Sequence, residues 1–223
     1  MLQMDDRQLY ERKYFDGYYA NDKRRDEMYK QEARRIQERA DFGNILDIGC
    51  GVGGFLSTLD DRWKKYGFEP SEYAAEKATA RGITMLRNTA SIDTEVFDVV
   101  VFRGTLQHMS KPIETLAHAT RGLRKGGLLV ILATPDTDGI VYKLWGKLPP
   151  LDAPRNWVLF GNRFLRNILE RMDYENIEVL HPYFGTPYAN PVKDFLAFLI
   201  SLFFGWRKFA FPGNMMEIYA VKK

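Results

Sequence analysis

The residues with the clearest chemical meaning are a carboxylate and a run of glycines at one point in the chain. Residues 44–48 form an apolar run that contains Asp47, and Gly49, Gly51 and Gly53 follow it directly. Such a run is typical of a buried parallel strand, and glycines let the backbone turn tightly and approach a ligand because they carry no Cβ. We therefore predict that a small molecule binds where this strand ends.

The chemistry of that molecule depends on Asp47. The glycines also satisfy a dinucleotide fingerprint, Gly49-x-Gly51-x-x-Gly54, in which a helix N-terminus receives a pyrophosphate. A carboxylate just before the first glycine would repel a phosphate, but it suits a ligand with an ammonium group, a sulfonium and no phosphate. This reasoning favours S-adenosylmethionine over NAD. Cys50 lies within the glycine turn, where we expect a small side chain to pack beneath the ligand.

Four motifs in order resemble those of the class I S-adenosylmethionine-dependent methyltransferases. The first is the Asp-x-Gly-x-Gly-x-Gly turn at 47–53. Residues 66–71 resemble the second strand of the family, which ends in an acidic residue, here Glu69, that hydrogen-bonds the ribose of the cofactor. Residues 97–108 resemble the fourth strand with its loop, and 123–135 resemble the Gly-Gly entry to the fifth strand. The resemblance implies a methyltransferase fold with S-adenosylmethionine as the cofactor.

The resemblance also implies which residues contact the cofactor. Ala90 and Ser91 follow the third strand and would meet the adenine, while the end of the fourth strand would close over the methionine half. Arg103 could also meet an acidic substrate. The full predicted set is Asp47, Gly49, Cys50, Gly51, Gly53, Glu69, Pro70, Ala90, Ser91, Phe102, Arg103 and Gly104.

His108 is the residue that we predict to act as a general base. It follows the fourth strand, where an acceptor hydroxyl would approach, and a neutral imidazole can take up the proton of that hydroxyl. The alternative is a histidine that only hydrogen-bonds the loop backbone. Gln107 stands where relatives often have a glutamate, and Asn156 stands where a bacterial-type subgroup has a histidine, so proton transfer is not carried over from those positions. For His118 and His181 we predict structural roles.

The alternation of apolar strands and helical segments predicts one α/β domain over residues 1–223. Hydrophobic residues make up 45% of the 223, which is enough for one full core. We expect a Rossmann-like, doubly wound, seven-stranded sheet that is mostly parallel and covered on both faces, with an antiparallel C-terminal strand over 215–221. The other strands are expected to begin near residues 44, 65, 83, 97, 127 and 174, and the helices to span 22–40, 54–61, 71–80, 112–123 and 161–172.

Within this domain, four parts have different expected roles. They are a lid and surface helix at 1–40, a cofactor-binding core at 41–134, a substrate-side insertion at 135–162, and a C-terminal helix with strands at 163–223. The aromatic stretch 14–19 would supply the lid, and its rings would either stack on the adenine or a substrate or form a hydrophobic docking patch. Trp145, Trp157 and Phe160 would either line the substrate pocket or anchor a long loop.

The most apolar stretch of the chain is 195–206. It is too short to span a bilayer, which takes about 20 apolar residues. Arg207 and Lys208 follow it, so segment 195–208 could rest on an anionic membrane surface, line a pocket for a lipid-like acceptor or form a homodimer interface. A partly buried helix that caps the pocket is the fourth interpretation.

Charge and cysteine content bound the remaining partners. The net charge is +3 and the 27% of charged residues mix both signs, which predicts no nucleic-acid partner. A single cysteine excludes an internal disulfide, and the spacing of cysteine and histidine predicts no metal site. The polar N-terminus lacks the apolar core of a secretory signal, so a cytoplasmic protein is expected.

We therefore expect a methyltransferase that acts on a small-molecule acceptor. The acceptor group would be a hydroxyl of a sugar, a lipid-linked intermediate or a natural product. A NAD-dependent oxidoreductase and a non-catalytic cofactor-binding or scaffold protein with the same fold are the alternatives.

Overall fold

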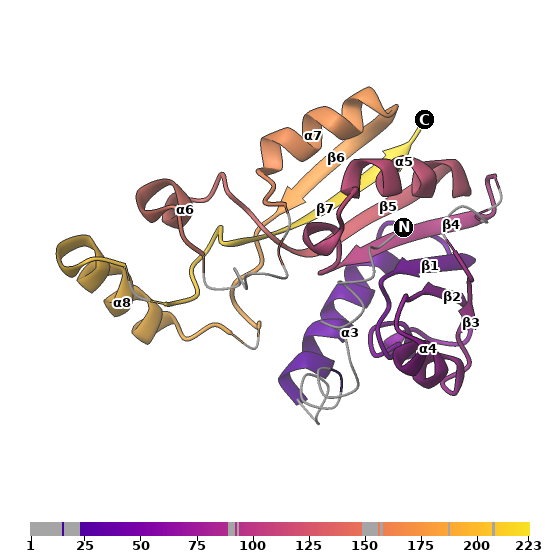
Figure 1. Ribbon diagram of the computed structural model, residues 1–223, viewed down its shortest axis with the longest axis horizontal. Coiled ribbons are helices and arrows are strands. Elements are labelled where there is room, and N and C mark those ends of the chain that lie inside the picture. The colour runs from indigo at the N-terminus through magenta and orange to yellow at the C-terminus, as the bar shows by residue number, and fades with distance from the viewer. Residues whose placement is uncertain are drawn as a thin grey trace.

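The computed structural model describes residues 15, 23–88, 92, 94–148, 156, 158–186, 188–206 and 208–223. The described chain forms a seven-stranded sheet in the order β3-β2-β1-β4-β5-β7-β6, with helices on both faces (Figure 1). The strands are β1 (Asn44–Ile48), β2 (Lys64–Phe68), β3 (Thr84–Met85), β4 (Phe97–Arg103), β5 (Leu123–Pro135), β6 (Tyr174–Leu180) and β7 (Met215–Lys222).

The directions of the strands confirm the predicted topology. β1 pairs in parallel with β2 and β4, β2 with β3, and β4 with β5, whereas β7 lies antiparallel between β5 and β6. β4 is buried over most of its length, as is typical of a parallel strand that is covered on both faces. β5 begins before the expected start at residue 127, since Leu123 already pairs with Phe97.

The helices divide between the two faces of the sheet (Figure 1). Ile36 and Ala78 place α3 and α4 in one hydrophobic cluster, and Leu116 and Leu169 place α5 and α7 in the cluster on the opposite face. The helices are α3 (Lys23–Gln37), α4 (Glu72–Thr79), α5 (Pro112–Gly122), α6 (Ile140–Trp145), α7 (Asn162–Arg171) and α8 (Pro191–Phe204), with short 3-10 turns η1 (Leu56–Thr58) and η3 (Leu106–His108).

The prediction of a helix at 54–61 is wrong, because only the 3-10 turn η1 forms there. Ser57 donates its hydroxyl to the carbonyl of Gly53 at 2.8 Å, and Thr58 donates to the carbonyl of Phe55 at 2.7 Å. Side chains that bond to nearby carbonyls offer the backbone an alternative to a regular helix. The apolar spacing of this segment therefore produces a buried turn, with Leu56 in the core.

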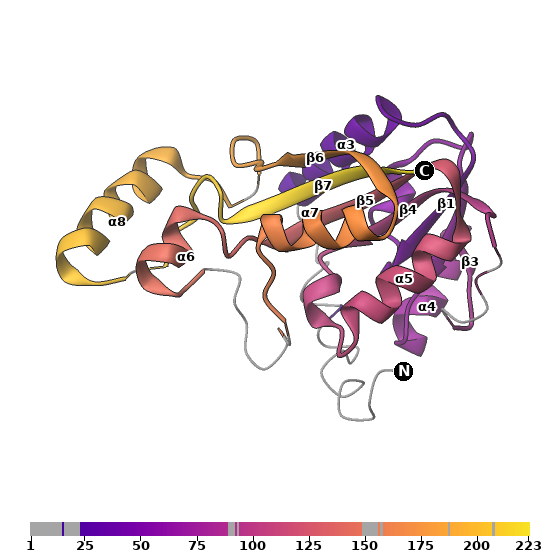
Figure 2. The same cartoon turned by 90° about the horizontal axis from the view of Figure 1, so that it is seen from above.

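α6 and α8 extend beyond the carboxyl ends of β5 and β6, away from the layers of the sheet (Figures 1 and 2). They share a small hydrophobic cluster with Trp206, Phe209 and Phe211, and this cluster is separate from the two that cover the sheet. We call α6, α8 and the described residues of 206–211 the satellite. Among the described helices, none is long and apolar enough to cross a membrane.

Candidate active site

The glycine turn lies at the point where the order of the strands reverses. β1 stands between β2 and β4, and ligands of such sheets bind beyond the carboxyl ends of the strands at this switch point. Gly49, Gly51 and Gly53 have positive φ angles of 82°, 55° and 79°. A Cβ on Gly49 would lie 2.3 Å from Cγ2 of Thr105, in the loop after β4, so the two loops pack too closely for any larger residue.

Glu69 holds the glycine turn in place from the end of β2. Its carboxylate accepts the backbone N–H of Gly51 at 2.9 Å and that of Ser71 at 3.0 Å. Burial raises the pKa of Glu69, and these two N–H groups oppose the rise. A carboxylate has about four acceptor positions, so the described contacts leave room for the hydroxyls of a ribose.

Asp47 is the most unusual group of the site. It is 2% exposed, and its Oδ1 has no hydrogen-bond partner among the described residues. Burial raises the pKa of Asp47 to about 7, with Glu69 and Glu32 adding to the rise and Arg103 opposing it. A buried carboxylate with an unsatisfied oxygen is costly unless a donor or a cation meets it. The ammonium group of S-adenosylmethionine fits this requirement.

Arg103 at the end of β4 is engaged by α3. Its guanidinium donates to both carboxylate oxygens of Glu32, at 2.6 and 3.2 Å, and lies 4.3 Å from the centre of the Tyr29 ring. Burial raises the pKa of Glu32, and Arg103 opposes that rise. The side chain thus points toward α3, so any cofactor contact of Arg103 would come from its backbone or its aliphatic part.

The other predicted cofactor residues differ in what they can offer. The thiol of Cys50 is buried and its pKa is raised by burial, which makes it an unreactive packing group. The side chain of Phe102 is fully buried in the core, so only its backbone can face a ligand. Gly104 has a φ of 63°, and Pro70 is half-buried beside Glu69. Ala90 and Ser91 lie outside the described residues.

One residue of the predicted aromatic lid is described. Phe15 is buried against Val52 of the glycine turn and Ala74 of α4, with its ring 6.4 Å from that of Tyr73. This contact places Phe15 on the turn that would hold the cofactor. The rest of the stretch 14–19 lies outside the described residues.

His108 lies in η3, at the carboxyl end of β4 as predicted. Its Nε2 is 3.4 Å from Nε2 of Gln107, which is itself buried. The insertion reaches this turn, because Val158 donates its backbone N–H to the carbonyl of Gln107 at 3.3 Å. His108 therefore stands between the end of β4 and the insertion, while His118 lies within α5.

The sequence reasoning missed a second imidazole that is held by a carboxylate. Nε2 of His181, just after β6, lies 2.7 Å from Oδ2 of the fully buried Asp136, just after β5. Asp136 also accepts the backbone N–H groups of Asp138 and Asn162 and the side-chain amide of Asn162. Asp136 directly follows the fifth strand, but nothing in the sequence spacing links it to a histidine 45 residues away.

The aromatic residues of the insertion pack inside the protein. Trp145 meets Phe198 and Phe209 edge-on within the satellite, and Phe160 is buried in the main core with Phe164 stacked on it. Both contacts favour the interpretation that these residues anchor a loop. Trp157 lies outside the described residues.

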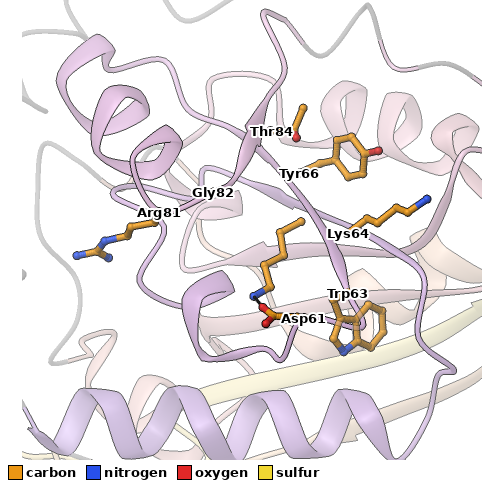
Figure 3. Close-up of a pocket in the computed structure, with 8 residues that line it drawn as sticks. Asp61, Trp63, Lys64, Tyr66, Arg81, Gly82 and Thr84 are labelled. Atoms are coloured by element: carbon orange, nitrogen blue, oxygen red, sulfur yellow. Dashed lines mark ion pairs between the residues drawn. The ribbon is translucent and has the colours of Figure 1, made fainter.

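A hollow of about 380 Å³ is formed by Asp61, Trp63, Lys64, Lys65, Tyr66, Arg81, Gly82 and Thr84 (Figure 3). It lies at the start of β2 and β3, so it is at the opposite edge of the sheet from the glycine turn. Because ligands of this fold bind at the carboxyl ends of the strands, we do not assign the cofactor to it. No cluster of three or more potential metal ligands occurs in the part of the chain that the structure describes.

Comparison with known proteins places these features in a family. The sequence profile of the family described as "Methyltransferase domain" matches residues 20–179, which is more than half of the chain. The chain belongs to this family and is an S-adenosylmethionine-dependent methyltransferase, as predicted. Family membership also excludes the NAD-dependent oxidoreductase as an alternative.

Solved structures agree in fold. A SAM-dependent methyltransferase from Thermotoga maritima has a TM-score of 0.64 and 23% identity, covering 94% of this chain and 99% of that one. Phosphoethanolamine N-methyltransferase 2 from Haemonchus contortus, in complex with S-adenosyl-L-methionine, has a TM-score of 0.58 and 15% identity, covering 95% and 59%.

Among curated proteins, the chain is similar to parts of larger enzymes. A malonyl-[acyl-carrier protein] O-methyltransferase from Paenibacillus sp. (strain JDR-2) is 32% identical over 123 residues, covering 46% of this chain and 45% of the relative. A tRNA U34 carboxymethyltransferase from Desulfotalea psychrophila is 34% identical over 108 residues, covering 43% and 32%. The matched region thus spans less than half of either relative.

Proposed function

We propose that this methyltransferase acts on a hydroxyl group of a small molecule, such as a sugar, a lipid-linked intermediate or a natural product. The observation that supports this proposal is a pair of imidazoles, His108 and His181, at the edge of the sheet where an acceptor must approach. A hydroxyl has to lose its proton as its oxygen is methylated, so this reaction needs a base. The relatives named above act on different acceptors, and the proposal therefore rests on the residues of this chain.

We assign the cofactor to the switch point of the sheet. When bound, S-adenosylmethionine would supply an activated methyl group on a sulfonium. The acceptor oxygen would take this methyl group in line, and S-adenosylhomocysteine would leave as the neutral thioether. The carboxylate of Asp47 would hold the ammonium group, Glu69 would hold the ribose, and Gly49 and Gly51 would let the backbone approach the ligand. Gly104 would face the methionine half from the end of β4. The main catalytic contribution of the protein would then be to align the acceptor.

Two histidines are candidates for the base. His108 follows the carboxyl end of β4. Its imidazole would accept the proton of the hydroxyl directly. For His181, the carboxylate of Asp136 favours the tautomer that carries its hydrogen on Nε2. Nδ1 of His181 is then the basic nitrogen. Asp136 would then act as a positioning residue for His181.

The partners predicted from the sequence complete the proposal. We propose no nucleic-acid substrate, because the net charge of +3 is spread over residues of both signs.

The test is a transfer assay with methyl-labelled S-adenosylmethionine and a panel of glycosides, prenyl-linked sugars, phenols, amines and tRNA. We expect transfer to a hydroxyl acceptor. Replacement of the true base, in His108→Gln or His181→Gln, should lower kcat by about a hundred- to ten-thousand-fold with unchanged affinity for S-adenosylmethionine. His118→Gln on α5 is the matched control.

Transfer only to amines or to tRNA would overturn the acceptor class. Full activity of both His108→Gln and His181→Gln on a hydroxyl would overturn the assignment of a histidine base.

A further inference from the structure

α8 exposes its large apolar side chains to solvent. The helix has ordinary end signals, because Asn190 accepts the backbone N–H of Lys193 at 3.2 Å, Pro191 opens the first turn and Gly205 follows the last with a φ of 86°. The element is therefore well defined. Six apolar side chains on it are 49% to 80% exposed, namely Val192, Phe195, Leu196, Leu202, Phe203 and Phe204.

The opposite face of α8 is buried and contains two polar side chains. Asp194 is 5% exposed and accepts the hydroxyl of Tyr183 and the backbone N–H of Asn190, each at 2.8 Å. Ser201 is 1% exposed, one turn beyond Phe198, which packs on the satellite cluster. A surface helix in water normally has its apolar stripe inside and its polar stripe outside. The outer face of α8 departs from this pattern, because it is apolar as well.

This outer face exposes a sizeable apolar area. Phe195, Phe203 and Phe204 are 56%, 80% and 80% exposed. Taking the surface of one phenylalanine as about 200 Å², these three alone expose on the order of 400 Å² of apolar surface, about the size of the largest apolar patch of a typical monomer. No described element covers them.

The charges around this face have one sign. In the described parts of 139–148 and 190–214, the exposed charged side chains are Lys143, Lys147, Lys193 and Lys208. The one acidic side chain in these ranges, Asp194, is buried. Lys147 also lies over the ring of Trp206, 5.6 Å from its centre. The apolar face is thus accompanied by positive charge.

We propose that the outer face of α8 docks on the surface of an anionic lipid bilayer. The 14 residues of α8 span about 21 Å, which is too short to cross a bilayer but suits a helix that lies in the interface plane. The four lysines complement anionic head groups. A second copy of the same face would instead bring lysines together, and like charges oppose that contact.

The location of α8 connects this surface to the site. The satellite lies beyond the carboxyl ends of β5 and β6, the edge of the sheet that carries His181 (Figures 1 and 2). A bilayer at α8 would therefore lie on the acceptor side of the protein, and an amphiphilic acceptor could present its hydroxyl head group from the membrane. This last step rests on the proposed hydroxyl acceptor, whereas the docking itself does not.

The experiment is co-sedimentation of the full chain with vesicles of phosphatidylcholine and phosphatidylglycerol, with pure phosphatidylcholine vesicles as the reference. We expect binding to the anionic vesicles that weakens in high salt. Phe203→Ser with Phe204→Ser should lower the bound fraction about tenfold or more, because both side chains are highly exposed and their loss spares the core. Phe164→Ser on α7, at a half-exposed phenylalanine away from the satellite, is the matched control.

The charge component has its own pair of variants. Lys193→Glu with Lys208→Glu should weaken binding to anionic vesicles about tenfold. Lys125→Glu, at the amino end of β5, should change it little. Calorimetric titration with S-adenosylmethionine is measured on every variant, and unchanged affinity shows that each one is folded.

Absence of vesicle binding by the wild-type chain would overturn the proposal. A dimer in ultracentrifugation that Phe203→Ser dissolves, without vesicle binding, would also overturn it and would assign the face to a second copy. Neither result bears on the hydroxyl acceptor, which the transfer assay tests without vesicles.

Discussion

Asp47 is a buried carboxyl group whose ionised form destabilises the folded protein when no ligand is bound. Its carboxyl is buried, one oxygen lacks a partner among the described residues, and its pKa is raised to about 7. A raised pKa means that the protonated form is favoured in the folded chain. Ionisation of Asp47 therefore lowers the free energy of unfolding. This loss is absent below the unfolded pKa near 3.8 and reaches its full value above about pH 7.

Asp47→Asn should have opposite effects on stability and on binding. Without ligand, the variant should be more stable than the wild type at pH 8, by up to about 4 kcal/mol, and this difference should shrink as the pH falls toward 4. Affinity for S-adenosylmethionine should fall about ten- to a hundredfold, because a charge-assisted hydrogen bond to the ammonium group is lost. Urea unfolding at both pH values and calorimetric titration measure the two effects.

Asp61→Asn is the control for this variant, since the side chain of Asp61 is fully exposed and lies 4.0 Å from Lys65. It should leave stability and affinity unchanged. In the wild type, affinity should rise as the pH increases from about 5.5 to 7.5, because the cation prefers the ionised carboxyl. An unchanged affinity of Asp47→Asn for the cofactor would contradict the assigned role.

At the scale of elements, α3 is joined to the sheet by buried charges. Glu32 and Arg103 form a bidentate pair with side chains only 2% and 9% exposed. On the same helix, Arg35 donates to both carboxylate oxygens of Glu217 on β7, at 2.7 and 2.9 Å. Both pairs fix α3 beside Asp47, whose pKa responds to Glu32 and Arg103.

Glu32→Gln should destabilise the protein by about 3–5 kcal/mol, because Arg103 would be left as a buried cation without its partner. Removing both charges, in Glu32→Gln with Arg103→Gln, should recover part of this loss. Glu38→Gln just past α3 should cost less than about 0.5 kcal/mol, because the pair of Glu38 with Arg39 is exposed. Urea unfolding of the four proteins tests this order, and equal losses for Glu32→Gln and Glu38→Gln would contradict it.

The elements also show which parts of the structure can be predicted from the sequence. The strands and the glycine turn can be predicted because apolar runs indicate buried strands and closely spaced glycines indicate a tight turn. The burial of Glu32 was not, since a glutamate in a charge-rich helix resembles a solvated residue until its partner on β4 is known. The pairing of Asp136 with His181 and the burial of Asp194 in α8 depend in the same way on contacts between separate segments.

At the scale of the whole molecule, the chain has a cofactor-binding body and a smaller satellite with its own core. The satellite cluster contains Val141, Leu148 and Phe209, and it is separate from the two clusters that flank the sheet. Phe198 joins α8 to this cluster, 4.6 Å from the ring centre of Phe211 and stacked on it. Separate cores permit local opening of one part without unfolding of the other.

Phe198→Ala should therefore loosen the satellite alone. Hydrogen exchange of peptides from α6, α8 and segment 206–211 should become about tenfold faster, while peptides from β1 and β4 keep their protection. The affinity for S-adenosylmethionine should not change.

The control is Leu116→Ala, in the fully buried core between α5 and the sheet. This variant should instead cost about 2–5 kcal/mol and speed exchange throughout the body. Faster exchange of β1 and β4 in Phe198→Ala would show that the satellite is energetically part of the body, and membrane docking at α8 would then be coupled directly to the cofactor site.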